Sequence, residues 1–184
     1  GKANSTSTLP IGDNNASTPV TDTAAATTFF GGSIKDSGTG IMALTKTGEG
    51  TQTFTGANTY SGATTINKGI LMAGAVNTLS ASSAVTIAND ATAMLALTNG
   101  LADFSQTILS LSGGGTVNLG TIAAADTVST PGTRLTTGST ADTTYSGIIV
   151  GGGGLVKQGS GTFAITGANT YVGTTQVTEG NLQV

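Results

Sequence analysis

The chain has 184 residues, a net charge of −3 and only 8% charged side chains, which fits one packed domain and argues against a disordered segment. Its six basic residues are scattered singly, so no basic stripe is present that could neutralise the phosphates of a nucleic acid. It contains neither cysteine nor histidine, which excludes disulfides, thiolate metal sites and catalytic centres built on an imidazole.

Residues 1–28 are rich in Ser, Thr, Ala and Asn and hold two of the three prolines. We expect a low-complexity segment, which is either a frayed linker or an irregular cap over the unpaired strand edges of the first structural turn. The chain opens at Gly1 without a signal peptide, which suggests a mature or excised piece. No apolar stretch approaches the ~20 residues that a membrane helix needs.

From residue 29 onward, the sequence predicts an all-β succession of short strands separated by glycine-containing turns, because Thr, Val and Ile favour strands and the 29 glycines favour corners. The strand candidates are 41–46, 51–55, 64–67, 70–72, 84–87, 93–97, 108–111, 116–119, 147–150, 155–157, 163–166, 176–178 and 181–184. Alternation places apolar pairs on one face of several candidates, namely Val85 with Ile87, Leu95 with Leu97, Leu109 with Leu111, Val117 with Leu119, and Phe163 with Ile165.

Short strands of this kind fit either a β-sandwich or a coiled parallel solenoid, and the sequence favours the solenoid. The Asn-Gly and Asp-Gly signals of tight hairpins are missing from the duplicated unit described next. Tryptophan is absent and aromatic residues make up only 4%, so the core must be thin and mostly aliphatic. At ~20–25 residues per coil, residues 29–184 predict a solenoid of roughly seven or eight coils.

The strongest signal is an internal repeat, because residues 44–73 recur 111 positions later at 155–184 with 15 of 30 positions identical. Both copies contain a lysine, a Gly-x-Gly-Thr turn and a Thr-Gly-Ala-Asn-Thr-Tyr-x-Gly run. They differ where Gln52 stands in place of Phe163, and where Met72 stands in place of Gln183. Such a unit cannot bury its apolar face alone, so its neighbours must stack on the same cross-section.

We assign structural roles to the shared residues. The glycines are expected at corners with positive φ or close backbone approach, and the asparagines to satisfy turn backbone or to be left-handed themselves. The tyrosines are expected to pack over a corner with the hydroxyl outward, and Lys46 and Lys157 to be solvated or to keep a strand face from pairing wrongly. The residues concerned are Gly48, Gly50, Thr51, Gly56, Asn58, Tyr60, Gly62 and Gly69, with Gly159, Gly161, Thr162, Gly167, Asn169, Tyr171, Gly173 and Gly180 in the second copy.

The pattern Gly-x-Gly-Thr … Thr-Gly-Ala-Asn-Thr-Tyr-x-Gly-x-Thr-Thr … Gly-x-Leu, at 48–71 and, with Gln176 in place of the last Thr of the run, at 159–182, resembles the passenger-associated repeat of bacterial autotransporters. The lead-in segments 30–34 and 145–149 and the linking stretch 77–120 are similar to other rungs of such passengers. The resemblance implies a right-handed parallel β-helix, exported to the cell surface through a C-terminal outer-membrane barrel that this stretch does not include. In that family the repeat is associated with folding and secretion, and the passengers are commonly adhesins.

The sequence offers little for catalysis or metal binding. Its acidic residues are spaced too widely to form a local cluster, and it has a single arginine, Arg134. The glycine-rich stretch 113–118 lacks the aspartate of a calcium-binding coil, and no Gly-Lys-Ser/Thr follows the paired glycines as a phosphate loop requires. We therefore expect no enzyme activity, no cofactor and no metal.

Three functional classes remain. The first is a surface-displayed adhesin scaffold, secreted to the bacterial surface, whose repeats template folding and promote export and whose partner is a host-surface protein or glycan. The second is a fibre or surface-layer subunit that self-associates through open solenoid ends. The third is an ice- or crystal-binding threonine array, which the second copy does not continue because Ala164 replaces Thr53.

Overall fold

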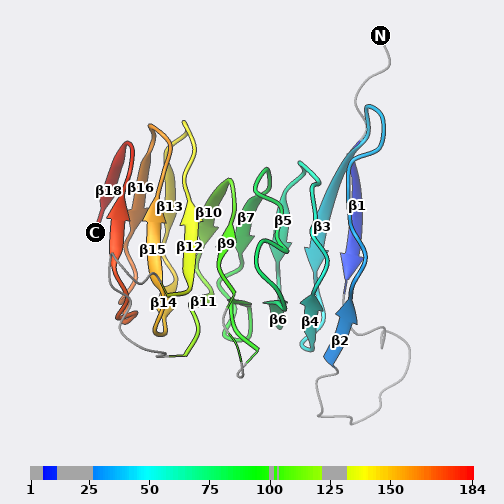
Figure 1. Ribbon diagram of the computed structural model, residues 1–184, viewed down its shortest axis with the longest axis horizontal. Coiled ribbons are helices and arrows are strands. Elements are labelled where there is room, and N and C mark those ends of the chain that lie inside the picture. The colour runs from blue at the N-terminus through cyan, green and yellow to red at the C-terminus, as the bar shows by residue number, and fades with distance from the viewer. Residues whose placement is uncertain (1–5, 12–26, 100–101, 103, 122–131) are drawn as a thin grey trace.

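The computed structural model describes residues 6–11, 27–99, 102, 104–121 and 132–184, and every regular element among them is a β-strand. All strand pairings between these elements are parallel, and the strands lie side by side along the long axis of the molecule (Figure 1). The expected parallel β-solenoid is therefore confirmed. No helix of the described residues is long and apolar enough to cross a membrane.

The strands form three sheets. The eight-stranded sheet contains, in spatial order, β1 (Thr6–Ile11), β3 (Ile41–Lys46), β5 (Thr64–Ile66), β7 (Ala84–Ile87), β10 (Ser110–Gly113), β13 (Thr143–Tyr145), β16 (Thr162–Ile165) and β18 (Asn181–Gln183). The six-stranded sheet contains β14 (Ile148–Val150), β11 (Thr116–Asn118), β8 (Met94–Ala96), β6 (Ile70–Ala73), β4 (Thr51–Phe54) and β2 (Thr27–Phe30). The four-stranded sheet contains β17 (Thr175–Val177), β15 (Gly154–Lys157), β12 (Arg134–Thr137) and β9 (Gln106–Thr107).

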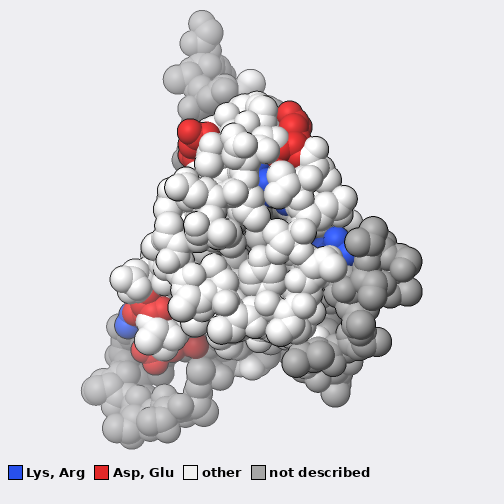
Figure 2. Space-filling view, turned by 90° about the vertical axis from the view of Figure 1, so that its left-hand side faces the viewer, with Lys and Arg blue, Asp and Glu red and all other residues white. Residues whose placement is uncertain are grey.

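Each strand pairs with its counterparts one turn before and one turn after it. On the eight-stranded sheet, for example, Leu44 pairs with Thr64, which in turn pairs with Val85. The chain makes about seven turns in this way. Seen from its C-terminal end, the solenoid has a roughly triangular outline and an almost uncharged face (Figure 2).

The three faces of this prism are not built alike along its length. The third face is the one that carries the four-stranded sheet, and its first strand is β9. In the earlier turns this face is formed by the irregular segments 55–63 and 74–83. The inward side chains form one continuous core from Ile34 to Ile165, made mainly of Leu, Ile and Val with Phe54, Phe163 and two buried tyrosines. Burial of each large apolar side chain contributes about 1.5–3 kcal/mol before the ordering cost of the chain is subtracted.

Several strands lack a clear sequence signal. β9, β12 and β13 have at most one large apolar inward residue each, so the alternation of apolar and polar residues did not predict them. The predicted pairing of Leu109 with Leu111 on one inward face is wrong, because Leu109 is 40% exposed whereas Ile108 and Leu111 are fully buried. The chain turns from the four-stranded to the eight-stranded sheet between β9 and β10, and a corner interrupts the period-two pattern of a strand.

The N-terminal segment supplies two strands. β1 pairs along its whole length with β3, and β2 pairs with β4. Pro10 lies in β1, an edge strand of its sheet, where a residue without a backbone N–H is tolerated. The division of the chain at residue 28 stays a prediction, since much of that segment lies outside the described residues.

Candidate functional site

The two repeat copies occupy different faces of the prism. In the first copy, β3 and β5 lie in the eight-stranded sheet, and β4 and β6 lie in the six-stranded sheet. In the second copy, β15 and β17 lie in the four-stranded sheet, and β16 and β18 lie in the eight-stranded sheet. The repeat is thus rotated by one face about the solenoid axis, so its geometry belongs to the unit and not to one side of the molecule.

Glycine corners stack directly on one another within each copy. A Cβ added at Gly69 would lie 2.4 Å from the carbonyl oxygen of Gly48 and 2.5 Å from that of Gly50. Gly180 stands in the same relation to Gly159 and Gly161, at 2.4 and 2.6 Å. Gly69 and Gly180 also have φ of +66° and +68°, so any other residue there combines strain with a backbone clash.

The glycines in the longer segments between strands have a different role, because they allow the backbones of two successive turns to approach closely. A Cβ at Gly56 or Gly62 would lie 2.2 or 2.3 Å from a backbone oxygen of the preceding turn. In the second copy Gly167 and Gly173 would meet backbone atoms of the preceding turn at 1.8 and 2.4 Å. At these four positions the repeat therefore places glycine where two backbones pass in contact.

The expectation that Lys46 and Lys157 are solvated is wrong. Both are only 1% exposed and share the inward face of their strand with Leu44 and Leu155. The Nζ of Lys157 donates to the carbonyl oxygens of Gln158, Gly159 and Glu179, at 2.8, 2.6 and 3.1 Å.

The first copy has the same arrangement. The Nζ of Lys46 donates to the carbonyl oxygen of Gly48 and, at 3.3 Å, to that of Lys68. From the sequence alone, a lysine in a strand is interpreted as a solvated residue, even where it alternates with leucine. The structure buries it because the corner turns carbonyl groups inward, where they need a donor.

Asn58 links three successive turns through its side-chain amide. Its Oδ1 accepts from the backbone N–H of Ile34 at 2.7 Å, and its Nδ2 donates to the carbonyl oxygens of Gly56 and Thr78 at 3.2 and 2.6 Å. Asn169 makes the equivalent bonds to Ile149 and Gly167, at 2.9 and 3.0 Å. Both asparagines thus satisfy turn backbone with their amides, and neither is among the described residues with positive φ.

The expected outward orientation of the tyrosine hydroxyls is wrong for Tyr60. Tyr60 is fully buried, and its hydroxyl lies 2.7 Å from Thr64 Oγ1, which lies 2.8 Å from Ser83 Oγ of the next turn. Burial raises the pKa of the Tyr60 phenol. Tyr171 forms the same bond to Thr175 Oγ1, at 2.6 Å, on the exposed last turn.

Two further repeat residues are Thr51 and Thr162, which begin β4 and β16 directly after the corner glycines. The backbone N–H of Thr162 is capped by Asp142 Oδ1 at 2.7 Å. Gln52, at the position of Phe163, is buried with its Oε1 2.7 Å from Thr28 Oγ1, so a polar residue is accommodated beside the exposed strand β2.

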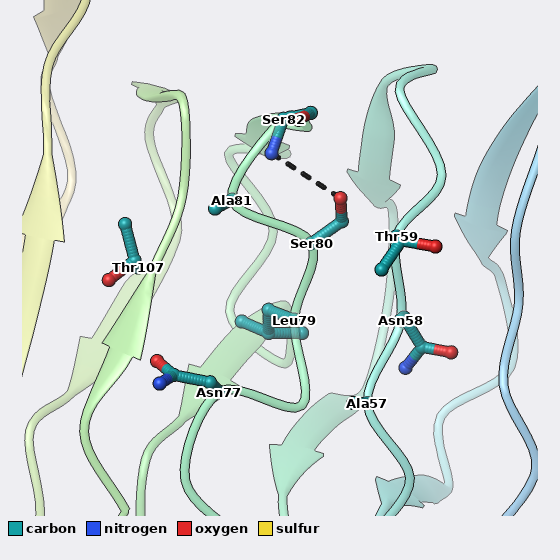
Figure 3. Close-up of a pocket in the computed structure, with 9 residues that line it drawn as sticks. All are labelled: Ala57, Asn58, Thr59, Asn77, Leu79, Ser80, Ala81, Ser82 and Thr107. Atoms are coloured by element: carbon teal, nitrogen blue, oxygen red, sulfur yellow. Dashed lines mark hydrogen bonds between the residues drawn. The ribbon is translucent and has the colours of Figure 1, made fainter.

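Charge is sparse on the described surface. The one salt bridge recorded among the described residues joins Lys68 and Glu49 at 3.7 Å. Within the described ranges, no group of three acidic, histidine or cysteine residues lies close enough to hold a metal ion. A shallow groove of about 380 Å³ on the third face is lined by residues without any ionisable side chain, among them Asn77, Leu79 and Ser82 (Figure 3). It supplies no acid–base pair.

This geometry defines a class of protein, a parallel β-solenoid whose turns are joined by glycine corners, inward lysines and amide ladders. The passenger-associated-transport-repeat family matches residues 44–73 and 155–184, the two copies described above. Over 165 residues, 89% of this chain, the sequence is 34% identical to the adhesin BmaC autotransporter of Brucella suis biovar 1 (strain 1330), of which the match covers 4%. No solved structure matches the chain.

The chain therefore belongs to the autotransporter passengers that carry the passenger-associated-transport repeat. It is a section of a secreted passenger that is displayed on the cell surface. It spans a small fraction of the length of the relative that it matches.

Proposed function

We propose that this section is a non-catalytic scaffold of the passenger, and that the repeat at 155–184 templates the folding of the turns before it. The observation that carries the proposal is the dependence of each turn on its neighbour. Ile66 in the first copy is fully buried, whereas the equivalent Val177 on the last turn is 47% exposed.

The energetics support a template. Burying one apolar side chain contributes about 1.5–3 kcal/mol, whereas ordering the backbone costs about 1–2 kcal/mol per residue. A single turn with only two or three such side chains does not fold alone, and stability arises when turns stack. A chain exported through a C-terminal translocator would remain extended until several turns stack outside, after which retreat is unfavourable.

Deletion tests this role. We expect removal of 155–184 to slow the folding of the remaining chain at least several-fold in stopped-flow refolding, because the template surface is lost. Removal of 1–26, which deletes β1, is the matched control and should leave the folding rate nearly unchanged. An unchanged rate after removal of 155–184 would refute the template.

The scaffold role itself makes a second prediction. A scaffold requires an adhesive contact elsewhere in the passenger or on this surface, with a host-surface protein or glycan as partner. Binding of host cells by passengers with and without this section, at equal surface display, separates a spacer from an adhesive element.

Self-association of this stretch is a second candidate function, and the observation that favours it is the sparse charge beside its strand edges. β17 and β18 are edge strands of their sheets, and the face they border is almost free of charge (Figure 2). Exposed strand edges pair with other chains unless charge or a cap prevents it. Concentration-dependent filaments in negative-stain microscopy would support this role, and a monomer at all concentrations would exclude it.

A further inference from the structure

The packing of the core does not by itself explain why two lysines are buried in it. Burying a charged ammonium inside a solenoid core is unfavourable, because the group loses its hydration and hydrogen bonds within the protein must replace it. An apolar residue of the same length would fill the space without that cost. The chain nevertheless places a lysine there in both copies, at two different corners of the prism.

We infer that Lys46 and Lys157 are register pins, positioning residues that fix the alignment of their own turn with the next turn toward the C-terminus. In both copies the ammonium joins carbonyl groups from two successive corners. Lys46 connects the corner at Gly48 with that at Lys68, and Lys157 connects Gly159 with Glu179.

The strands of this solenoid need such a device. They are two to six residues long, so each strand has few side chains that can specify its alignment with the next turn. A one-residue slip is prevented because it turns the inward residues outward. A two-residue slip keeps every inward residue inward, so apolar packing discriminates against it only weakly.

The ammonium discriminates against that slip strongly. Two residues of strand correspond to a shift of about 6.6 Å, which is more than twice the length of a hydrogen bond. In the native register Lys46 lies opposite Ile66, and Lys157 opposite Val177, at the end of each strand where the following corner begins. A slipped turn would leave the buried ammonium without the carbonyl group of the next corner, whatever surface the passenger binds.

Cysteine cross-linking reads the register directly, since the chain has no cysteine of its own. Thr45 and Thr65 are paired on the outer side of β3 and β5, so a disulfide between Thr45→Cys and Thr65→Cys reports the native register. Thr45→Cys with Ala63→Cys, or with Asn67→Cys, reports a two-residue slip in either direction. Paired positions lie about 5 Å apart and slipped ones about 8 Å, and only the first distance permits a disulfide.

In the Lys46→Met chain we expect the slipped pairs to form disulfides at least threefold faster than in the parent chain, with a matching loss from the native pair. Lys35→Met removes one lysine charge from an exposed position that takes no part in the Lys46 hydrogen bonds, and it should leave the native pattern unchanged. Native-pair cross-linking at the parental rate in Lys46→Met, with no slipped product, would overturn the inference.

The second copy keeps the test decisive if Lys46→Met does not fold. Lys157→Met affects a strand followed by a single turn, so the preceding turns retain their own packing. Here Val156→Cys with Gln176→Cys reports the native register, and Val156→Cys with Thr178→Cys or Thr174→Cys the slipped ones. A last turn that keeps its native pairing in Lys157→Met also overturns the inference.

Discussion

The two copies of the repeat offer a natural experiment, because the same residues stand in two environments. The first copy has turns stacked on both sides, and the second forms the last turns of the described chain. Tyr60 and Thr64 are fully buried, whereas Tyr171 is partly exposed and Thr175 is exposed. The same residue types at matching positions thus differ in burial, and the neighbouring turn makes the difference.

The comparison also shows which half of the repeat depends on its neighbour. Leu44 and Leu155 are both fully buried, and so are the two lysines. The divergence begins in the second half, where Leu71 is fully buried and Leu182 only partly. The first half of each repeat is covered by its own second half, and the second half is covered only by a following turn.

Backbone contact gives the largest expected difference between the copies. Gly62→Val places a side chain against Met42 O and should lower the free energy of unfolding by about 3 kcal/mol or more, because turns on both sides must move. Gly173→Val creates a similar clash but should release mainly β17 and β18. Urea denaturation followed by circular dichroism measures both. Gly38→Ala is the control, since Gly38 has φ of +59° but open space around it.

An equal loss of the free energy of unfolding in Gly62→Val and Gly173→Val would contradict the claim that the last turn is packed against a neighbouring turn on one side only. A loss of more than ~2 kcal/mol for Gly38→Ala would show that positive φ, and not backbone contact, dominates.

Core truncation should give the next largest difference. Leu71→Ala removes a fully buried side chain and should cost about 2–4 kcal/mol, whereas Leu182→Ala at the matching position should cost about 1 kcal/mol. Thermal and urea unfolding of the two variants provide the measurement. Equal costs would mean that Leu182 is as well covered in solution as Leu71.

The buried hydroxyl chain should give a smaller effect. Tyr60→Phe removes a hydrogen bond to Thr64 inside the core and should destabilise by about 1 kcal/mol. Tyr171→Phe removes the same bond at an exposed position and should change stability by less than about 0.5 kcal/mol. A Tyr171→Phe effect as large as that of Tyr60→Phe would contradict this account.

Acid sensitivity should distinguish the copies most weakly. Hydrogen bonds from Met42 N–H, from the Ser61 hydroxyl and from Ser61 N–H hold the pKa of Asp36 below its ordinary value. The second copy has Val172 at the position of Ser61 and lacks the hydroxyl. Because the folded-state pKa is lowered, the stabilisation is present above about pH 4 and is lost as the pH falls through the folded-state pKa.

The Ser61 amide shift, followed by NMR, should therefore titrate with a midpoint below that of an unfolded aspartate, and Asp36→Asn should abolish the titration. A midpoint at or above pH 4 would show that these hydrogen bonds do not favour the charged carboxylate.

Much of the architecture could be predicted from the sequence, because repetition and alternation are local signals. The glycines at 62 and 69, with their partners at 173 and 180, recur at fixed spacing, and spacing is what a solenoid preserves. The resemblance to the passenger-associated repeat carried the family assignment.

The roles of the lysines and of Tyr60 could not be predicted, because their partners belong to other turns or to corner carbonyl groups. Lys46 is satisfied partly by a carbonyl group 22 residues away, and Tyr60 reaches Ser83 through Thr64. Sequence shows a cation or a phenol but not the carbonyl groups that a corner turns inward. The rotation of the second copy by one face could not be predicted either, because it depends on how many strands each intervening turn contains.

Native-state hydrogen exchange compares the two copies most directly. If neighbouring turns supply the burial, amides in β5 and β6 should exchange only through global unfolding, whereas those in β17 and β18 should exchange through a local opening of lower free energy. Equal protection of the matched strands, at Ile66 and Val177 or at Leu71 and Leu182, would contradict the claim that a turn is completed by the one stacked upon it.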